Sequence, residues 1–274
     1  MIAIVTDSTI CITRAQAEAL GLYIVPDSYS VRDRLFHEGF SDENGDFEPL
    51  IFGEPERCKT SQAPVSTFIK QFEELIAKDM DVLCLVISSR LSGTYSSACI
   101  AAREVDPRRV AVVDSLSTAG GLHLLAEKAR ELSAKGLSLW TLAERIEGMR
   151  EQAGIVFSVD SMAALRRSGR IGIVPMSVGT VLNIRPILLC VRGTVVARGL
   201  VRGKAERLRA LVSRVPENAK HIMIHYLGDL AQVESLRELL AQRFRGIDIR
   251  VNRGGPVLGI HLGTGALGVS WITV

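Results

Sequence analysis

Short apolar runs alternate with helical patterns along the first half of the chain. Runs rich in Val, Ile and Leu, as expected of strands buried on both faces, occur at residues 1–5, 82–87 and 110–113. Apolar side chains recur at helical spacing after Pro64, at Val65, Phe68, Ile69, Phe72, Leu75 and Ile76. Further helical patterns cover 95–105, 121–134 and 136–152. This alternation predicts a parallel sheet of the α/β type.

The pattern changes near residue 153. Two strand-like runs, 184–191 and 194–201, flank Arg192-Gly193 and predict a β-hairpin. Helix-like and strand-like segments then alternate, at 204–215, 221–226, 230–243 and 247–251. We therefore predict an α/β protein of two domains. Residues 1–153 would form a mostly parallel sheet flanked by helices, and residues 154–274 a mixed or antiparallel sheet with helices.

The final 21 residues, 254–274, contain no Lys, Arg, Asp or Glu. Six glycines, together with Pro256 and His261, argue against a membrane-spanning helix, so we expect buried strands there. The apolar N-terminus lacks a cationic lead and reaches Asp7 too early for a signal peptide. We expect a cytoplasmic protein with peripheral or no membrane contact.

Composition and cysteine spacing narrow the class of protein further. Hydrophobic residues make up 47% and charged residues 23% of the 274 residues, which excludes an intrinsically disordered chain. The five cysteines are scattered, without a C-x-x-C or a Cys/His spacing typical of metal sites, so we expect neither a metal nor a disulfide framework. Cys84, inside an apolar run, is expected to be a core residue.

Charge divides unevenly between the two halves. Residues 1–152 carry 16 Lys and Arg against 23 Asp and Glu, a net charge of −7. Residues 153–274 carry 17 against 7, a net charge of +10. This second half could face an anionic partner, or its basic residues could simply be solvated. Nucleic acid is the weakest candidate partner, because no recognition motif accompanies the charge.

The predicted strands of the first half end in hydroxyl or carboxylate side chains. These are Thr6-Asp7-Ser8, Ser88-Ser89 and Asp114-Ser115. Ligands gather outside the carboxyl ends of strands in open α/β sheets. Ser, Thr and Asp also cap helices, so capping is an equally simple explanation.

Two motifs for nucleotides and a hydrolase motif fail on inspection. A G-x-G-x-x-G occurs at Gly263, Gly265 and Gly268, but the chain ends six residues later and no helix can follow. No P-loop motif is present. Ser92, His261 and either Asp7 or Asp114 could supply a hydrolase triad, but Ser92 lacks the G-x-S-x-G elbow.

Four segments are unusual for ordinary core or surface. Residues 59–64 and 88–95 crowd hydroxyls before helices, where backbone N–H groups and hydroxyl donors can seat an anion without formal charge. Residues 168–171 contain Ser-Gly-Arg-Ile beside two further arginines. Residues 259–263 hold His261 between glycines, where the chain can approach a ligand closely.

These segments resemble the DegV family, fatty-acid-binding proteins that serve bacterial fatty acid kinase. The resemblance covers nearly the whole chain and follows the family's order, through Ile4-Val5-Thr6-Asp7-Ser8, Thr60-Ser61-Gln62, Leu91-Ser92-Gly93-Thr94, Val113-Asp114-Ser115, Ser168-Gly169-Arg170-Ile171, Leu182-Asn183-Ile184-Arg185-Pro186-Ile187 and the segment 261–268. The chain departs from the family at Ser168, where a second Gly is usual, and at Thr264, where Pro is common.

The resemblance implies a binding protein that is not itself a complete enzyme. A long-chain fatty acid would lie in a tunnel between or within two α/β domains. Its carboxylate would be bound by Thr60, Ser61, Ser92, Gly93 and His261. A separate kinase with ATP would phosphorylate the fatty acid to an acyl phosphate for phospholipid metabolism, and Arg170 and Arg202 would serve phosphotransfer or partner docking. No cofactor is implied. The alternative is a freestanding serine hydrolase, or a phosphotransferase with its own nucleotide, acting on acyl substrates.

Overall fold

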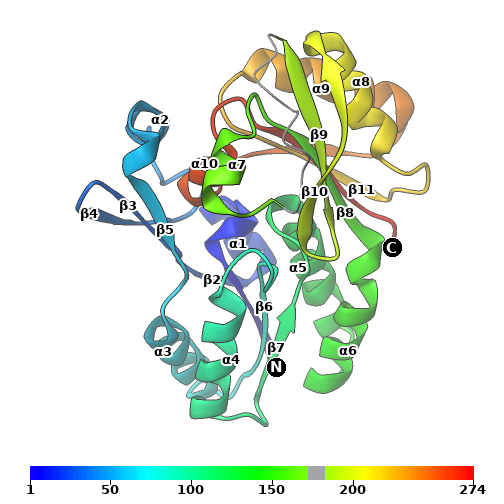
Figure 1. The fold of residues 1–274 in the computed structure, drawn as a ribbon. Helices are drawn as coiled ribbons and strands as arrows, with labels where there is room; N and C mark the ends of the chain where they lie inside the picture. Colours follow the sequence, from blue (N-terminus) through cyan, green and yellow to red (C-terminus); the bar gives the residue numbers. More distant parts are fainter. Residues whose placement is uncertain (172–182) are drawn as a thin grey trace.

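The computed structural model describes residues 1–171 and 183–274, which form three β-sheets with helices between and around them (Figure 1). Sheet A has the strand order β2-β1-β6-β7, and all its neighbouring strands are parallel. Its strands are β1 (Ile2–Asp7), β2 (Leu22–Val25), β6 (Asp81–Val86) and β7 (Val110–Asp114). The predicted parallel sheet of the first half is confirmed.

Helices cover both faces of sheet A. One face is covered by α3 (Val65–Ile76) and α4 (Thr94–Val105), which share a core with alternate residues of β1 and β6. The other face packs on α1 (Arg14–Leu20), α5 (Ala119–Ser133) and α6 (Leu139–Met149). Helix α3 forms as predicted, because Phe68, Phe72 and Leu75 fall on one side and are fully buried.

Sheet C is mixed and has the strand order β10-β9-β8-β13-β11-β12. Among its described strands, β11 and β12 pair in parallel and the other neighbours pair antiparallel. Its strands are β8 (Ala153–Ser158), β9 (Ile184–Val191), β10 (Thr194–Arg202), β11 (His221–Tyr226), β12 (Ile249–Arg253) and β13 (Leu267–Ile272). Helices α8 (Gly203–Arg214) and α9 (Leu230–Arg243) cover one face. The predicted hairpin is β9 and β10.

A small antiparallel sheet, sheet B, has no counterpart in the sequence prediction. It has the order β4-β3-β5 and consists of β3 (Ser28–Val31), β4 (Arg34–His37) and β5 (Cys58–Ser61). Its strands are only four residues long, so they carry little periodicity. Beside it lie the short helices α2 (Glu48–Gly53), α7 (Ala163–Ser168) and α10 (Pro256–Leu262) (Figure 1). Three 3-10 turns complete the described elements, at Ser8–Ile10, Pro55–Arg57 and Arg150–Gln152.

Helix α10 corrects the prediction of strands throughout 254–274. Pro256 begins this helix at a position where a missing backbone N–H costs nothing. Gly259 lets α10 approach α2 closely, since a Cβ there would lie 2.7 Å from Cδ1 of Ile51. The second part of the segment does form a buried strand, β13. The division into two domains at residue 153 stays a prediction, although every strand of sheet C begins at or after that residue.

Candidate functional site

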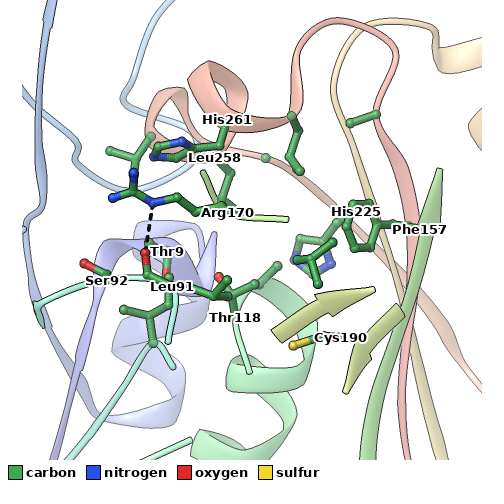
Figure 2. A pocket seen from close by; sticks show the side chains of 18 of the residues that line it. Thr9, Leu91, Ser92, Thr118, Phe157, Arg170, Cys190, His225, Leu258 and His261 are labelled. Carbon is green, nitrogen blue, oxygen red and sulfur yellow. Dashed lines mark hydrogen bonds between the residues drawn. The ribbon is translucent and has the colours of Figure 1, made fainter. Parts of the chain in front are cut away.

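A cavity of about 390 Å³ lies where sheet A, sheet C and sheet B meet (Figure 2). Its volume falls within the range of small-molecule sites. Most of the lining is apolar, and includes Ile87, Leu91, Ile155, Phe157, Leu165, Val195, Leu258 and Leu262. Hydroxyl groups gather on one side of this lining. The cavity is therefore suited to a ligand with a long apolar part and a small polar end.

The hydroxyl side comes from two segments that the sequence singled out. Thr60 and Ser61 lie on β5, at the edge where sheet B meets α10. Ser92 and Gly93 lie between the end of β6 and the start of α4. All four residues line the cavity, as does His261. The fold thus brings together side chains that are up to 201 residues apart in the sequence.

Gly93 is required by a close neighbour. A Cβ at this position would lie 1.8 Å from Oε1 of Gln62, whose Nε2 donates a hydrogen bond to Oγ of Ser97 at 2.8 Å. Gln62 therefore packs against the turn that precedes α4. Gly93 has no side chain to cap this helix, and the Thr94 N–H bonds to Oγ of Ser92, so the N–H groups that follow in the first turn are the ones available to an anion.

A chain of hydrogen bonds holds the Ser92 side chain. Its Oγ lies 2.9 Å from Oγ1 of Thr94, and it accepts a bond from the Thr94 backbone N–H at 3.3 Å. The Thr94 hydroxyl donates to Oδ1 of Asp27 at 3.0 Å. Asp27 is buried and also accepts from the Ala63 backbone N–H at 2.9 Å. A buried carboxyl group thus fixes the orientation of Ser92 through Thr94.

His261 stands beside Thr60 at the same end of the cavity. Its Nε2 lies 2.8 Å from Oγ1 of Thr60, while its Nδ1 is buried without a partner among the described residues. Burial, and then the positive charges of Arg170 and Arg167, lower the pKa of His261 to about 4. The imidazole is neutral at pH 7, so it can donate from only one nitrogen.

Of the two predicted arginines, only Arg170 reaches the cavity. Its Nε donates to the backbone oxygen of Leu91 at 3.2 Å, which places the guanidinium between Ser92 and His261 (Figure 2). Arg202 ends β10 and caps α8 on the exposed surface, and it does not line the cavity. Leu182, part of another predicted motif, lies outside the described residues.

Three buried carboxyl groups near this site were not predicted as a cluster. Asp7 accepts from the backbone N–H of Thr9 at 3.0 Å and of Ile87 at 2.6 Å. Glu38 accepts from the Val257 N–H at 2.6 Å, and its Oε1 has no partner among the described residues. Burial raises the pKa of Glu38 to about 8, and burial and then Asp7 raise that of Asp27. Asp7 was visible at the end of a predicted strand, but Asp27 and Glu38 lie in polar segments with no local signal.

The geometry does not assemble the hydrolase triad that the sequence left open. His261 bonds to Thr60, and the side-chain partner of Ser92 is Thr94. Asp114 accepts from the backbone N–H groups of Ser89 and Leu116. Among the described residues, no carboxylate orients His261 toward Ser92. The same part of the chain holds no group of three potential metal ligands and no helix long and apolar enough to cross a membrane.

The fold and the cavity define an α/β protein of three sheets with a mainly apolar cavity, at one end of which Thr60, Ser92, His261 and Arg170 gather. A family model described as "Uncharacterised protein, DegV family" matches residues 1–274. The chain belongs to the DegV family, as its motifs indicated.

Relatives match over almost the entire chain. A DegV domain-containing protein of Halalkalibacterium halodurans is 30% identical over 277 residues, covering 98% of each chain. One from Deinococcus radiodurans is 32% identical, covering 98% of this chain and 97% of its own. Protein DegV of Bacillus subtilis is 28% identical, covering 98% of each.

Solved structures share the fold, and several of them are described as fatty-acid binding. A protein of Thermotoga maritima, described as revealing fatty acid binding function, has a TM-score of 0.90 at 27% identity, covering 100% of this chain and 99% of its own. A DegV family protein of Thermus thermophilus, described by its fatty acid binding, has a TM-score of 0.86 at 30% identity with the same coverage. DegV of Bacillus subtilis, described as a fatty acid binding protein, has a TM-score of 0.84 at 26% identity, covering 99% and 98%.

Proposed function

We propose that this chain binds a long-chain fatty acid in the cavity and presents its carboxylate to a separate ATP-dependent kinase in the cytoplasm. One observation carries the proposal. Thr60, Ser92 and His261 meet at one end of a cavity whose remaining lining is mainly apolar. The fatty-acid binding described for related structures supports it. In this view the chain is a lipid-binding subunit and needs no cofactor.

The polar end can hold a carboxylate by neutral donors. When the Nε2 of His261 carries the ring proton, it donates to Oγ1 of Thr60, and the Thr60 hydroxyl proton is free to bond the ligand. Ser92 supplies a second hydroxyl when its proton turns from Oγ1 of Thr94 to the carboxylate, and Ser61 on β5 and Gly93 before α4 add further donors. Hydrogen bonds to a charged group are stronger than those between neutral groups, so this arrangement offsets the cost of burying the carboxylate.

The apolar lining provides most of the affinity. Each CH₂ group removed from water contributes about 0.8 kcal/mol of binding free energy. For an acyl chain of about sixteen carbons, the sum of these contributions exceeds the free energy lost when the hydrogen-bonded carboxylate is buried. Ordering a flexible chain and losing its free motion reduce this gain. The chemistry of the site therefore favours long chains over short ones.

The reaction that follows requires an incoming phosphoryl group. A carboxylate oxygen would attack the γ-phosphorus of ATP on the kinase, forming a new O–P bond while the bond to the bridging oxygen of ADP breaks. Positive charge near the transferred group stabilises this transfer. Arg170, exposed at the end of the cavity beside Ser92 and His261, would provide it. Arg202, on the surface at the start of α8, would contact the kinase.

The test begins with what the purified protein carries. Denaturing extraction and mass spectrometry should find a fatty acid at close to one per chain. A loaded chain incubated with a bacterial fatty acid kinase and ATP should then yield an acyl phosphate, trapped by hydroxylamine as the hydroxamate. A chain that is empty and also fails to take up octadecanoic acid would contradict lipid binding, while a loaded chain that gives no hydroxamate would contradict presentation to the kinase.

A further inference from the structure

His225 is a buried histidine that the proposed carboxylate site does not use. It lies on β11, is 8% exposed and lines the cavity. Neither Nδ1 nor Nε2 has a hydrogen-bond partner among the described residues. Figure 2 shows its ring beside Phe157, on the opposite side of the cavity from Ser92 and Arg170. An unpaired polar group buried in this way is costly unless something in the cavity bonds to it.

Small residues let helix α5 pack closely against one edge of this ring. Gly268 pairs with His225 across β11 and β13, and Ser270 follows on the same face of β13. Gly120, in the first turn of α5, lies against Ser270 and against the ring of His225. A Cβ at Gly120 would be 2.6 Å from Oγ of Ser270 and 2.9 Å from Cε1 of His225. Gly268 and Ser270 also line the cavity.

A second unpaired polar group, the hydroxyl of Thr118, also lines the cavity. Oγ1 of Thr118 is buried without a partner among the described residues, and Thr118 lines the cavity at the start of α5. It does not cap that helix with its side chain, so the first N–H groups of α5 are also free of a capping bond. The Ser270 hydroxyl lies in the same lining. The apolar cavity thus has a second polar region.

Resting on the proposed function, we infer that His225, with Thr118 and Ser270, forms a subsite for a hydroxyl group carried on the acyl chain, so that the preferred ligand is a hydroxylated long-chain fatty acid. A hydroxyl group both donates and accepts. A neutral imidazole offers one N–H donor and one nitrogen acceptor, which matches it. An unsubstituted acyl chain would leave these groups unpaired.

The charge state of His225 agrees with a neutral ligand group. Burial, and then His123 and Arg250, lower its pKa to about 3, so the ring carries no charge at pH 7. A second carboxylate at this end would face no cation among the lining residues, since Arg170 lies at the other end. A hydroxyl fits the subsite better than an acid.

The experiment compares octadecanoic acid with hydroxyoctadecanoic acids that carry the hydroxyl at successive positions along the chain. We expect at least one isomer to bind the wild-type protein roughly fivefold to tenfold more tightly than octadecanoic acid. His225→Phe should bring that ratio to about one, and His225→Gln, which keeps a donor and an acceptor, should retain a preference. Phe157→Leu is the control, because it changes the lining beside His225 without a polar atom and should leave the ratio unchanged.

The outcomes separate this inference from the proposed function. Equal binding of all the acids to wild-type protein, or a preference that survives in His225→Phe, would overturn the subsite and leave fatty acid binding intact. Failure of every acid to bind would overturn both. If His225→Phe does not fold, nitrogen NMR of the histidine rings in wild-type protein decides. The His225 resonances should shift with the preferred hydroxy acid beyond their shift with octadecanoic acid, and identical shifts would contradict the inference.

Discussion

Oγ1 of Thr60 lies 2.8 Å from Nε2 of His261, across 201 residues of sequence. Thr60 belongs to the edge of a small sheet and His261 to a short helix from the end of the chain. Their contact joins these two elements at the polar end of the cavity. The contact also sets whether the Thr60 hydroxyl proton can bond the ligand. That proton is available to the ligand when the neutral imidazole donates to Thr60, and it is used when the imidazole accepts from Thr60.

The two hydroxyls should contribute separately to lipid binding. Ser92→Ala and Thr60→Ala should each weaken fatty acid affinity by about 1.5–3 kcal/mol, the strength of a hydrogen bond to a charged group. Thr60→Ser keeps the hydroxyl and should stay close to wild type. Ser96→Ala, an exposed serine in the next turn, is the control. Titration with a fluorescent fatty acid measures the change, and unaltered affinity in both alanine variants would contradict the assigned carboxylate site.

The arginines should act after lipid binding. Arg170→Ala and Arg202→Ala should keep the fatty acid but lower the rate of kinase-dependent acyl phosphate formation by at least tenfold, because positive charge stabilises the transferring phosphoryl group or the complex with the kinase. Arg108→Ala is the matched control, since the Arg108 side chain is 90% exposed in the acidic half. Loss of bound lipid, quantified by mass spectrometry of the purified variants, would argue instead that these arginines hold the carboxylate.

Glu38 should make stability depend on pH. Its pKa is raised from 4.5 to about 8 by burial, so between these values the unfolded chain is ionised while the folded chain keeps the proton. This contribution is fully present below about pH 4.5 and is lost as the pH rises toward 8. Glu38→Gln cannot ionise at this position. Between pH 4 and pH 8, the free energy of unfolding of wild type should therefore fall by about 2–4 kcal/mol relative to that of Glu38→Gln. Urea unfolding at the two values measures this, and a constant difference would refute the assignment.

Arg207 should be required for folding stability rather than for binding. This fully buried side chain donates to Oε1 of Gln232 and to the backbone oxygens of Ser158 and Gly265. Arg207→Met leaves these acceptors unpaired and should lower the free energy of unfolding by about 2–4 kcal/mol. Arg209→Met, on the exposed side of the same helix, should change it little. Equal destabilisation of both variants in urea would contradict a special role for Arg207.

Long periodic segments were predictable because their pattern repeats often enough to fix a face. The apolar spacing after Pro64 and the paired runs around Arg192-Gly193 are examples, and both appear in the structure as α3 and the β9–β10 hairpin. Sheet B escaped prediction because strands such as Ser28–Val31 are too short to show alternation. Helix α10 escaped because Gly259 and the β-branched Val257 and Ile260 give it poor intrinsic helix propensity, and the helix is held by packing against α2.

By itself, the sequence determined the α/β class, the parallel first sheet and the hydroxyl-rich segments at residues 60 and 92, because periodicity and local composition are properties of neighbouring residues. Only the tertiary structure decided that Thr60 meets His261, that Asp27 fixes Ser92 through Thr94, and that His225 is left unpaired in the cavity. These relations join residues far apart in the chain, and each depends on how sheets and helices pack rather than on any local pattern. The same reason applies to the two arginines. The sequence resemblance singled out Arg170 and Arg202 alike, but packing brings only Arg170 of the two to the cavity.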